Sequence, residues 1–168
     1  MKIILRAAAS ALALAALSAS PAFAQDTATA ELDVSATVTE NCAVSTTAID
    51  FGDVDVTTGA AKPGTGALRV TCTSGTEWIA SADIGLGSGA SLATRKLTSG
   101  GNAMSYNLYT DANHTNLWGD GVGEETALFS DTGNGAQQSK TIYGRIFANQ
   151  ASLPSGDYAD TVTVTVSY

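Results

Sequence analysis

Two segments near opposite ends of the chain alternate strictly between apolar and polar residues, and this alternation most constrains the fold. From Thr27 to Val38 the apolar residues are Ala28, Ala30, Leu32, Val34, Ala36 and Val38. Near the C-terminus they are Tyr158, Val162, Val164, Val166 and Tyr168, with Asp160 interrupting the series. Because side chains alternate between the two faces of a β-strand, both segments predict strands with one apolar face.

The rest of the chain after residue 25 shows no helical periodicity. Short runs rich in Val, Ile, Thr and Tyr alternate with clusters of Gly, Asn, Asp and Ser, which is typical of an antiparallel sandwich or barrel. The predicted strands cover residues 65–73, 77–84, 94–98, 103–110 and 137–148. Predicted turns fall at residues 62–64, 99–102 and 154–156, and the second of these predicts a hairpin.

Residues 1–24 have the pattern of a secretory signal peptide. Lys2 and Arg6 precede an apolar run from Ala7 to Leu17, and residues 22–24 (Ala-Phe-Ala) match the small-x-small cleavage pattern. The apolar run is shorter than the ~20 residues of a membrane span. We therefore expect an exported protein that begins at Gln25 and resides in the periplasm or at the cell surface.

The mature chain is acidic and contains two cysteines. Without Lys2 and Arg6 it holds six basic and 16 acidic residues, a net charge of −10, which argues against nucleic-acid and membrane-surface binding. Cys42 and Cys72 form an even count without metal-type spacing, so in an oxidising compartment they predict one disulfide.

The two alternating segments also raise a question of pairing. No Gly or Pro lies between Gln25 and Phe51, so the first segment is expected to leave the body near Asn41 and project. The alternative is an ordinary edge strand whose apolar face packs on its own core. The C-terminal strand runs to Tyr168 without a following turn, so its outer edge needs a partner from elsewhere.

No catalytic or metal-binding pattern stands out, and we expect no enzyme and no cofactor. His114 is the single histidine, in a polar stretch that predicts a solvated turn, without a nucleophile elbow. The acidic clusters around Asp53 and Asp120 do not match a calcium loop. Aromatic residues could line a sugar-binding face, although cross-strand packing is the more ordinary role; they are Tyr106, Tyr109, Trp118, Tyr143 and Phe147.

Several stretches together resemble the spore coat protein U domain, which occurs in subunits of archaic chaperone–usher pili such as the Csu pilus. The stretches are residues 31–38 with 41–44, residues 49–52, residues 105–112 with 115–118, and residues 142–146 with 156–168. The resemblance implies an incomplete immunoglobulin-like β-sandwich that lacks its final strand. A periplasmic chaperone would fill the gap first, and the N-terminal strand of another subunit would later replace it.

This resemblance implies three parts: a signal peptide at 1–24, a donor strand extension at 25–40 and the sandwich domain at 41–168. The donor residues would be the even-numbered set from Ala28 to Val38. The acceptor or chaperone edge would be the C-terminal set from Tyr158 to Tyr168. Expected partners are copies of itself or related subunits, a chaperone and an outer-membrane usher. A monomeric secreted binding module and a coat-layer protein that assembles without a chaperone remain alternatives.

Overall fold

The computed structural model describes residues 25–122 and 126–168, and the predicted signal peptide lies outside them. The described residues from Thr37 onward form one compact unit, and those up to Ala36 belong to another. The strands are β1 (Cys42–Thr47), β2 (Lys62–Cys72), β3 (Glu77–Ala82), β4 (Arg95–Ser99), β5 (Asn102–Tyr109), β6 (Phe129–Thr132), β7 (Gln138–Ile146) and β8 (Val164–Ser167). A short 3-10 helix, η1 (Val56–Thr58), follows β1.

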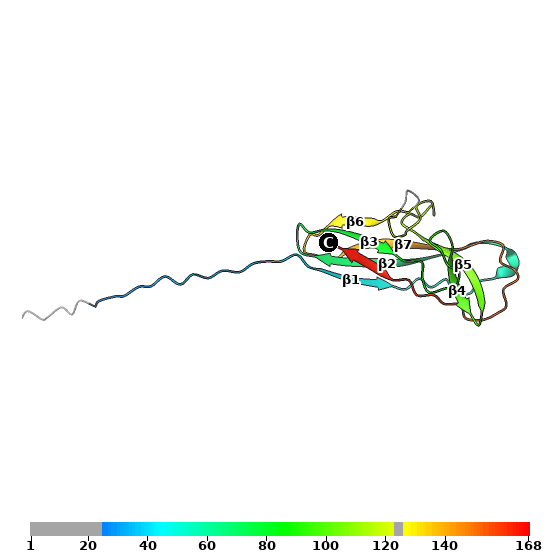
Figure 1. Ribbon diagram of the computed structural model, residues 1–168, viewed down its shortest axis with the longest axis horizontal. Helices are drawn as coiled ribbons and strands as arrows, with labels where there is room; N and C mark the ends of the chain where they lie inside the picture. The colour runs from blue at the N-terminus through cyan, green and yellow to red at the C-terminus, as the bar shows by residue number, and fades with distance from the viewer. Residues whose placement is uncertain (1–24, 123–125) are drawn as a thin grey trace, which may run out of the picture. The chain divides into compact units, whose positions relative to one another are not determined.

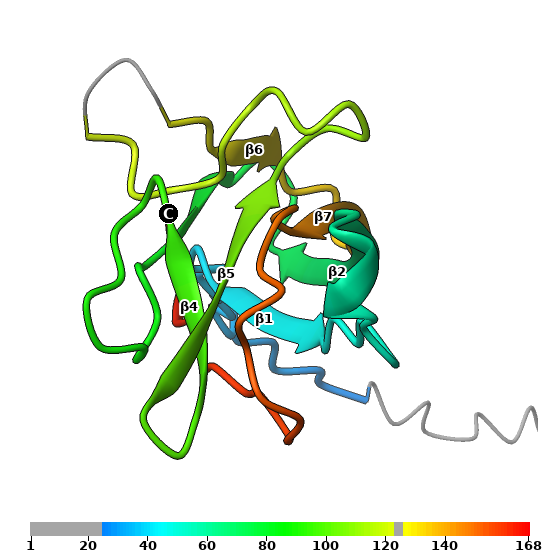
Figure 2. The same ribbon diagram turned by 90° about the vertical axis from the view of Figure 1, so that its right-hand side faces the viewer.

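The strands form two antiparallel sheets, which confirms the predicted all-β class (Figure 1). One sheet has the order β1-β2-β7-β5-β4 and the other the order β6-β3-β8. The β4–β5 hairpin and η1 lie at the end of the unit away from the C-terminus (Figures 1 and 2). Strands β1 and β8 are therefore edge strands of different sheets.

The core lies between the inward faces of the two sheets. Alternation along β7 buries Ile142, Gly144 and Ile146, as the sequence predicts. The other sheet contributes Trp78 and Ala80 of β3 to the core, and both are buried. The buried apolar residues are Leu68, Val70, Cys72, Trp78, Ala80, Ala82, Met104, Tyr106, Leu108, Trp118, Phe129, Ile142 and Ile146. Along β3 and β7, buried residues alternate with less buried ones, as expected for an antiparallel sandwich with one face on the core.

The disulfide and the hairpin also match the predictions. Cys42 and Cys72 are bonded and stand directly opposite each other as the first pair of the β1–β2 ladder. Ser99 pairs with Asn102, and the two glycines between them have φ values of 53° and 93°. A two-residue type I′ hairpin turn requires positive φ at both central residues, and its twist matches that of the flanking strands.

The predicted turn at residues 62–64 is wrong, because Pro63 and Gly64 belong to β2. A Cβ at Gly64 would lie 2.8 Å from Phe51, and one at the paired Gly144 would lie 2.9 Å from the same ring. The glycines thus allow Phe51 to pack directly on the sheet backbone. Strand β1 pairs only with the later half of β2, so Pro63 lies where one edge of β2 is free.

The two alternating end segments form less strand than predicted. At the C-terminus only Val164–Ser167 is a regular strand, paired with β3. The strand expected from Thr27 to Val38 is not formed in the single chain, and residues 25–41 are exposed without regular structure. An isolated alternating segment has no neighbour to complete its backbone hydrogen bonds, and a strand requires one.

Candidate acceptor groove

The C-terminal segment presents a half-buried apolar row. Tyr158, Val162, Val164 and Val166 are partly buried and pack against the core, whereas Tyr168 is 57% exposed. The intervening Thr161, Thr163, Thr165 and Ser167 are exposed. The predicted acceptor residues therefore share one face, and that face is only incompletely covered.

The backbone of this segment bonds to the sandwich on one side only. Ala159 exchanges two hydrogen bonds with Thr98 of β4, at 2.8 and 3.1 Å. The carbonyl of Thr163 accepts from the Asp83 N–H at 3.0 Å, and β8 continues along β3. The backbone N–H and C=O groups of successive residues in an extended segment point to opposite sides. Odd-numbered Ala159 and Thr163 bond to the sandwich, so the N–H and C=O groups of the even-numbered residues point to the open edge. An added strand could pair along this whole edge.

Asp160, which interrupts the apolar row in the sequence, anchors the start of the edge. Its carboxylate accepts hydrogen bonds from the Tyr106 hydroxyl (2.7 Å) and from the N–H groups of Leu86 and Thr161 (both 2.8 Å). Burial and the adjacent Asp160 carboxylate raise the pKa of Tyr106, so its hydroxyl remains a donor at neutral pH. A Cβ at Gly85 would collide with this carboxylate. The interruption is therefore a structural link between the C-terminal segment and the core.

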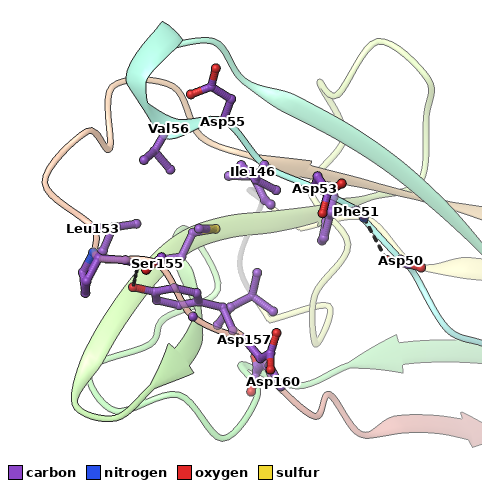
Figure 3. A pocket seen from close by; sticks show the side chains of 18 of the residues that line it. Asp50, Phe51, Asp53, Asp55, Val56, Ile146, Leu153, Ser155, Asp157 and Asp160 are labelled. Carbon is purple, nitrogen blue, oxygen red and sulfur yellow. Dashed lines mark hydrogen bonds between the residues drawn. The ribbon is translucent and has the colours of Figure 1, made fainter.

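A cavity of about 820 Å³ lies at this end of the edge (Figure 3). One wall is the segment from Ile49 to Thr57 after β1, and the other is the segment from Leu153 to Asp160. Val56, Leu153, Ile146 and Phe51 contribute apolar side chains to the lining, and several aspartates, Asp53 and Asp157 among them, contribute carboxylates (Figure 3). Asp50 and Asp55 are engaged locally, since each accepts from a backbone N–H two residues ahead.

At the opposite end, the two edge segments of the sandwich meet. The Tyr168 hydroxyl lies 3.4 Å from Asn41 Oδ1 and donates to it. Asn41 directly precedes Cys42, the disulfide-bonded first residue of β1. The acceptor groove is defined here as the open edge from Tyr158 to Tyr168 together with the cavity at its start.

The predicted donor residues are exposed in the single chain. Leu32, Val34 and Val38 have exposed fractions of 86%, 85% and 84%. Single exposed apolar side chains of this size are ordinary on a protein surface. A contiguous row of them along one face of a segment is instead typical of an interaction surface. The assignments of donor and acceptor residues remain predictions.

Comparison with known proteins places the fold in a family. A family model described as the Spore Coat Protein U domain matches residues 28–165. The chain belongs to the spore coat protein U domain family. It is 33% identical to Protein U of Myxococcus xanthus over 157 residues, covering 84% of this chain and 86% of the relative.

A solved structure shows the same fold as this spore coat protein U domain. It is the CsuC–CsuE chaperone–tip adhesion subunit pre-assembly complex from archaic chaperone–usher Csu pili of Acinetobacter baumannii. The TM-score is 0.59 at 21% identity, with 79% of this chain and 40% of the matched chain covered. The domain thus spans less than half the length of that chain.

In this spore coat protein U domain, Asn107 and Trp118, from the matched stretches 105–112 and 115–118, take part in a buried hydrogen-bond network around Arg95. Fully buried Arg95 donates to Asn107 Oδ1 at 2.6 Å and to the carbonyls of Asp83 and Trp118 at 2.7 and 2.9 Å. Trp118 Nε1 donates to the Ala80 carbonyl at 3.0 Å. Sequence reasoning missed Arg95, because a single arginine at a strand start gives no sign of burial.

The structure corrects the prediction for His114 and agrees with packing as the ordinary role of the aromatic residues. His114 is not a solvated turn residue; it is half-buried, with its ring 5.1 Å from that of Tyr109 and 6.4 Å from that of Tyr143. Tyr106 and Trp118 are buried in the core, so the five aromatic residues do not form one sugar-binding face.

Residues 25–122 and 126–168 hold neither a cluster of metal-ligating side chains nor a helix suited to crossing a membrane. Within those ranges, no group of three or more His, Cys, Asp or Glu side chains could hold a metal ion. Likewise, no helix in them has the length and apolar character needed to cross a bilayer.

Proposed function

We propose that this chain is the structural subunit of an archaic chaperone–usher pilus and polymerises by donor-strand complementation. One observation carries the proposal: an open edge with six alternating positions faces incompletely covered core, and the same chain holds a free segment with six matching positions. Both segments span eleven residues, from 28 to 38 and from 158 to 168. A partner strand would supply backbone hydrogen bonds along the edge and apolar side chains toward the core.

The comparisons support this assignment at the level of the family and the fold. The family comprises structural coat and pilus proteins rather than known enzymes. The similar solved structure is a complex of a chaperone with a pilus subunit, which supports a periplasmic chaperone as a partner here. Export by residues 1–24, passage through an usher, and a role in adhesion and biofilm formation complete the proposal.

Deletion of residues 25–38 tests the donor assignment. The truncated protein keeps the whole sandwich and its edge, so we expect it to bind its chaperone but not to extend a fibre. The readout is electrophoresis of unheated and heated periplasmic extracts, in which strand-exchanged polymers give ladders that collapse on heating. Ladders from the truncated protein would refute the donor assignment.

The family description, which names a spore coat domain, favours a second candidate, a coat protein that assembles without a chaperone. The same gels distinguish the two candidates when the protein is expressed with and without a candidate chaperone. Ordered ladders that form equally well without any chaperone would favour the coat protein.

A further inference from the structure

We propose that Asp160 sets the register of the incoming strand by requiring a small residue opposite it, and that this residue is Ala36 of a second copy. The inference rests on the proposed strand exchange and specifies how it occurs. Asp160 is the one polar side chain in the row of even-numbered residues from Tyr158 to Tyr168. Its two carboxylate oxygens are already engaged by Tyr106, Leu86 and Thr161, so its position is fixed.

A large apolar side chain is disfavoured opposite this carboxylate. Directly opposed residues of neighbouring strands bring their Cβ atoms to about 5 Å, on the same face. Valine or leucine at that position would press methyl groups against the engaged carboxylate and would gain no apolar contact from it. Alanine leaves the carboxylate and its hydrogen bonds undisturbed.

The direction of the incoming strand follows from where the segment leaves its own body. The segment continues through Asn41 into Cys42, at the end of the sandwich where Tyr168 meets Asn41. A donor strand parallel to β8 would place the donor's body at the Tyr168 end of the acceptor. The acceptor's own N-terminal segment leaves from that same end, so the two would compete for space. An antiparallel strand places the donor body at the cavity end instead, so the contact is head-to-tail and can repeat.

In the antiparallel direction, one register satisfies all six positions. It pairs Ala28 with Tyr168, Ala30 with Val166, Leu32 with Val164, Val34 with Val162, Ala36 with Asp160, and Val38 with Tyr158. The largest donor residue thus meets the middle of the valine row, and Ala28 meets Tyr168. A shift of two residues in one direction puts Val34 opposite Asp160, and a shift in the other direction puts Val38 there.

Cysteine pairs on the solvent face can measure this register without altering the core. In the proposed register Glu31 of one copy lies opposite Thr165 of another, and both side chains are exposed. Odd-numbered residues form the closely spaced, non-hydrogen-bonded pairs at this edge, with Cα atoms about 4.5 Å apart, which suits a disulfide. Glu31→Cys and Thr165→Cys are placed in separately tagged full-length copies, so that only an intermolecular bond can link the two tags.

The expected result is a heat-resistant, reductant-sensitive dimer of the two tags for Glu31→Cys with Thr165→Cys. Glu31→Cys combined with Thr163→Cys or with Ser167→Cys should give at least tenfold less of this dimer, because these pairs face each other only in the two neighbouring registers. A maximum at Thr161, Thr163 or Ser167 would overturn the register but keep strand exchange. No cross-link at any of the four positions in samples that still form ladders would overturn the register together with the edge assignment. Absence of ladders from the protein without the introduced cysteines, which keeps its Cys42–Cys72 disulfide, would reject the proposed function itself.

Substitution of Ala36 gives an independent readout. Ala36→Val should reduce the Glu31–Thr165 cross-link and the polymer ladder at least tenfold. Ala28→Val is the control, because Ala28 would face the exposed Tyr168, where added methyl groups find room. Equal losses in both variants, or no loss in Ala36→Val, would contradict the role of Asp160.

Discussion

Truncation of Leu32 separates strand exchange between copies from packing of the segment on its own body. Leu32 is 86% exposed in the single chain, so insertion into another copy would bury almost the whole side chain. Leu32→Ala removes three carbon atoms, which at about 0.8 kcal/mol per methylene weakens the contact by about 2 kcal/mol. This corresponds to a decrease in affinity of about 30-fold. The folding stability of the monomer should change by less than about 0.5 kcal/mol, as for other exposed positions.

Two measurements on the same variant check both values. The temperature at which polymer ladders collapse should fall for Leu32→Ala, whereas the urea midpoint of the monomer at low concentration should stay unchanged. Asp33→Ala is the control, since its side chain lies on the other face of the same segment. If Leu32→Ala destabilises the monomer by about 2 kcal/mol and leaves the polymer unaffected, the segment packs on its own core and the reasoning fails.

Three further predictions concern the sandwich itself. Arg95→Met removes the donor to Asn107 Oδ1 and to the carbonyls of Asp83 and Trp118, so the urea-measured free energy of unfolding should fall by about 3 kcal/mol or more. Gly144→Ala places a methyl group 2.9 Å from Phe51, and the resulting displacement should lower the free energy of unfolding by about 1–3 kcal/mol. The pKa of Asp111 lies below its usual range, because its carboxylate accepts hydrogen bonds from its own loop, the most important of them from the Asn116 N–H. The stability it provides is present above about pH 4 and is lost as the pH falls through the lowered pKa, so the melting temperature should fall in acid, and less so in Asp111→Asn.

Local patterns in the sequence were sufficient to predict the features that depend on neighbouring residues. The alternation in β7 predicts its buried face, and Gly100 with Gly101 predicts the hairpin because few other residues adopt positive φ. The disulfide between Cys42 and Cys72 follows from residue count and compartment.

The features that were missed depend on contacts between distant segments. Pro63 and Gly64 have the composition of a turn, but Phe51 and Ile49 pack on the glycine and hold it within a strand. The burial of Arg95 requires the carbonyl of Asp83, directly after β3, and that of Trp118, which only the folded chain brings together. For the candidate site, the sequence identified the two alternating segments and the interruption of the second one by Asp160. It could not show that Tyr106 and Leu86 hold that carboxylate in place.

The position of the disulfide has a mechanical consequence for a chain pulled at its N-terminal segment. Tension arriving through Asn41 would otherwise act on β1, an edge strand with a neighbour on one side only, and could peel it away one hydrogen bond at a time. The covalent link at the first rung passes that tension straight to β2, which has neighbours on both sides for much of its length. Reduction of this one bond should therefore lower the force at which the domain begins to unravel.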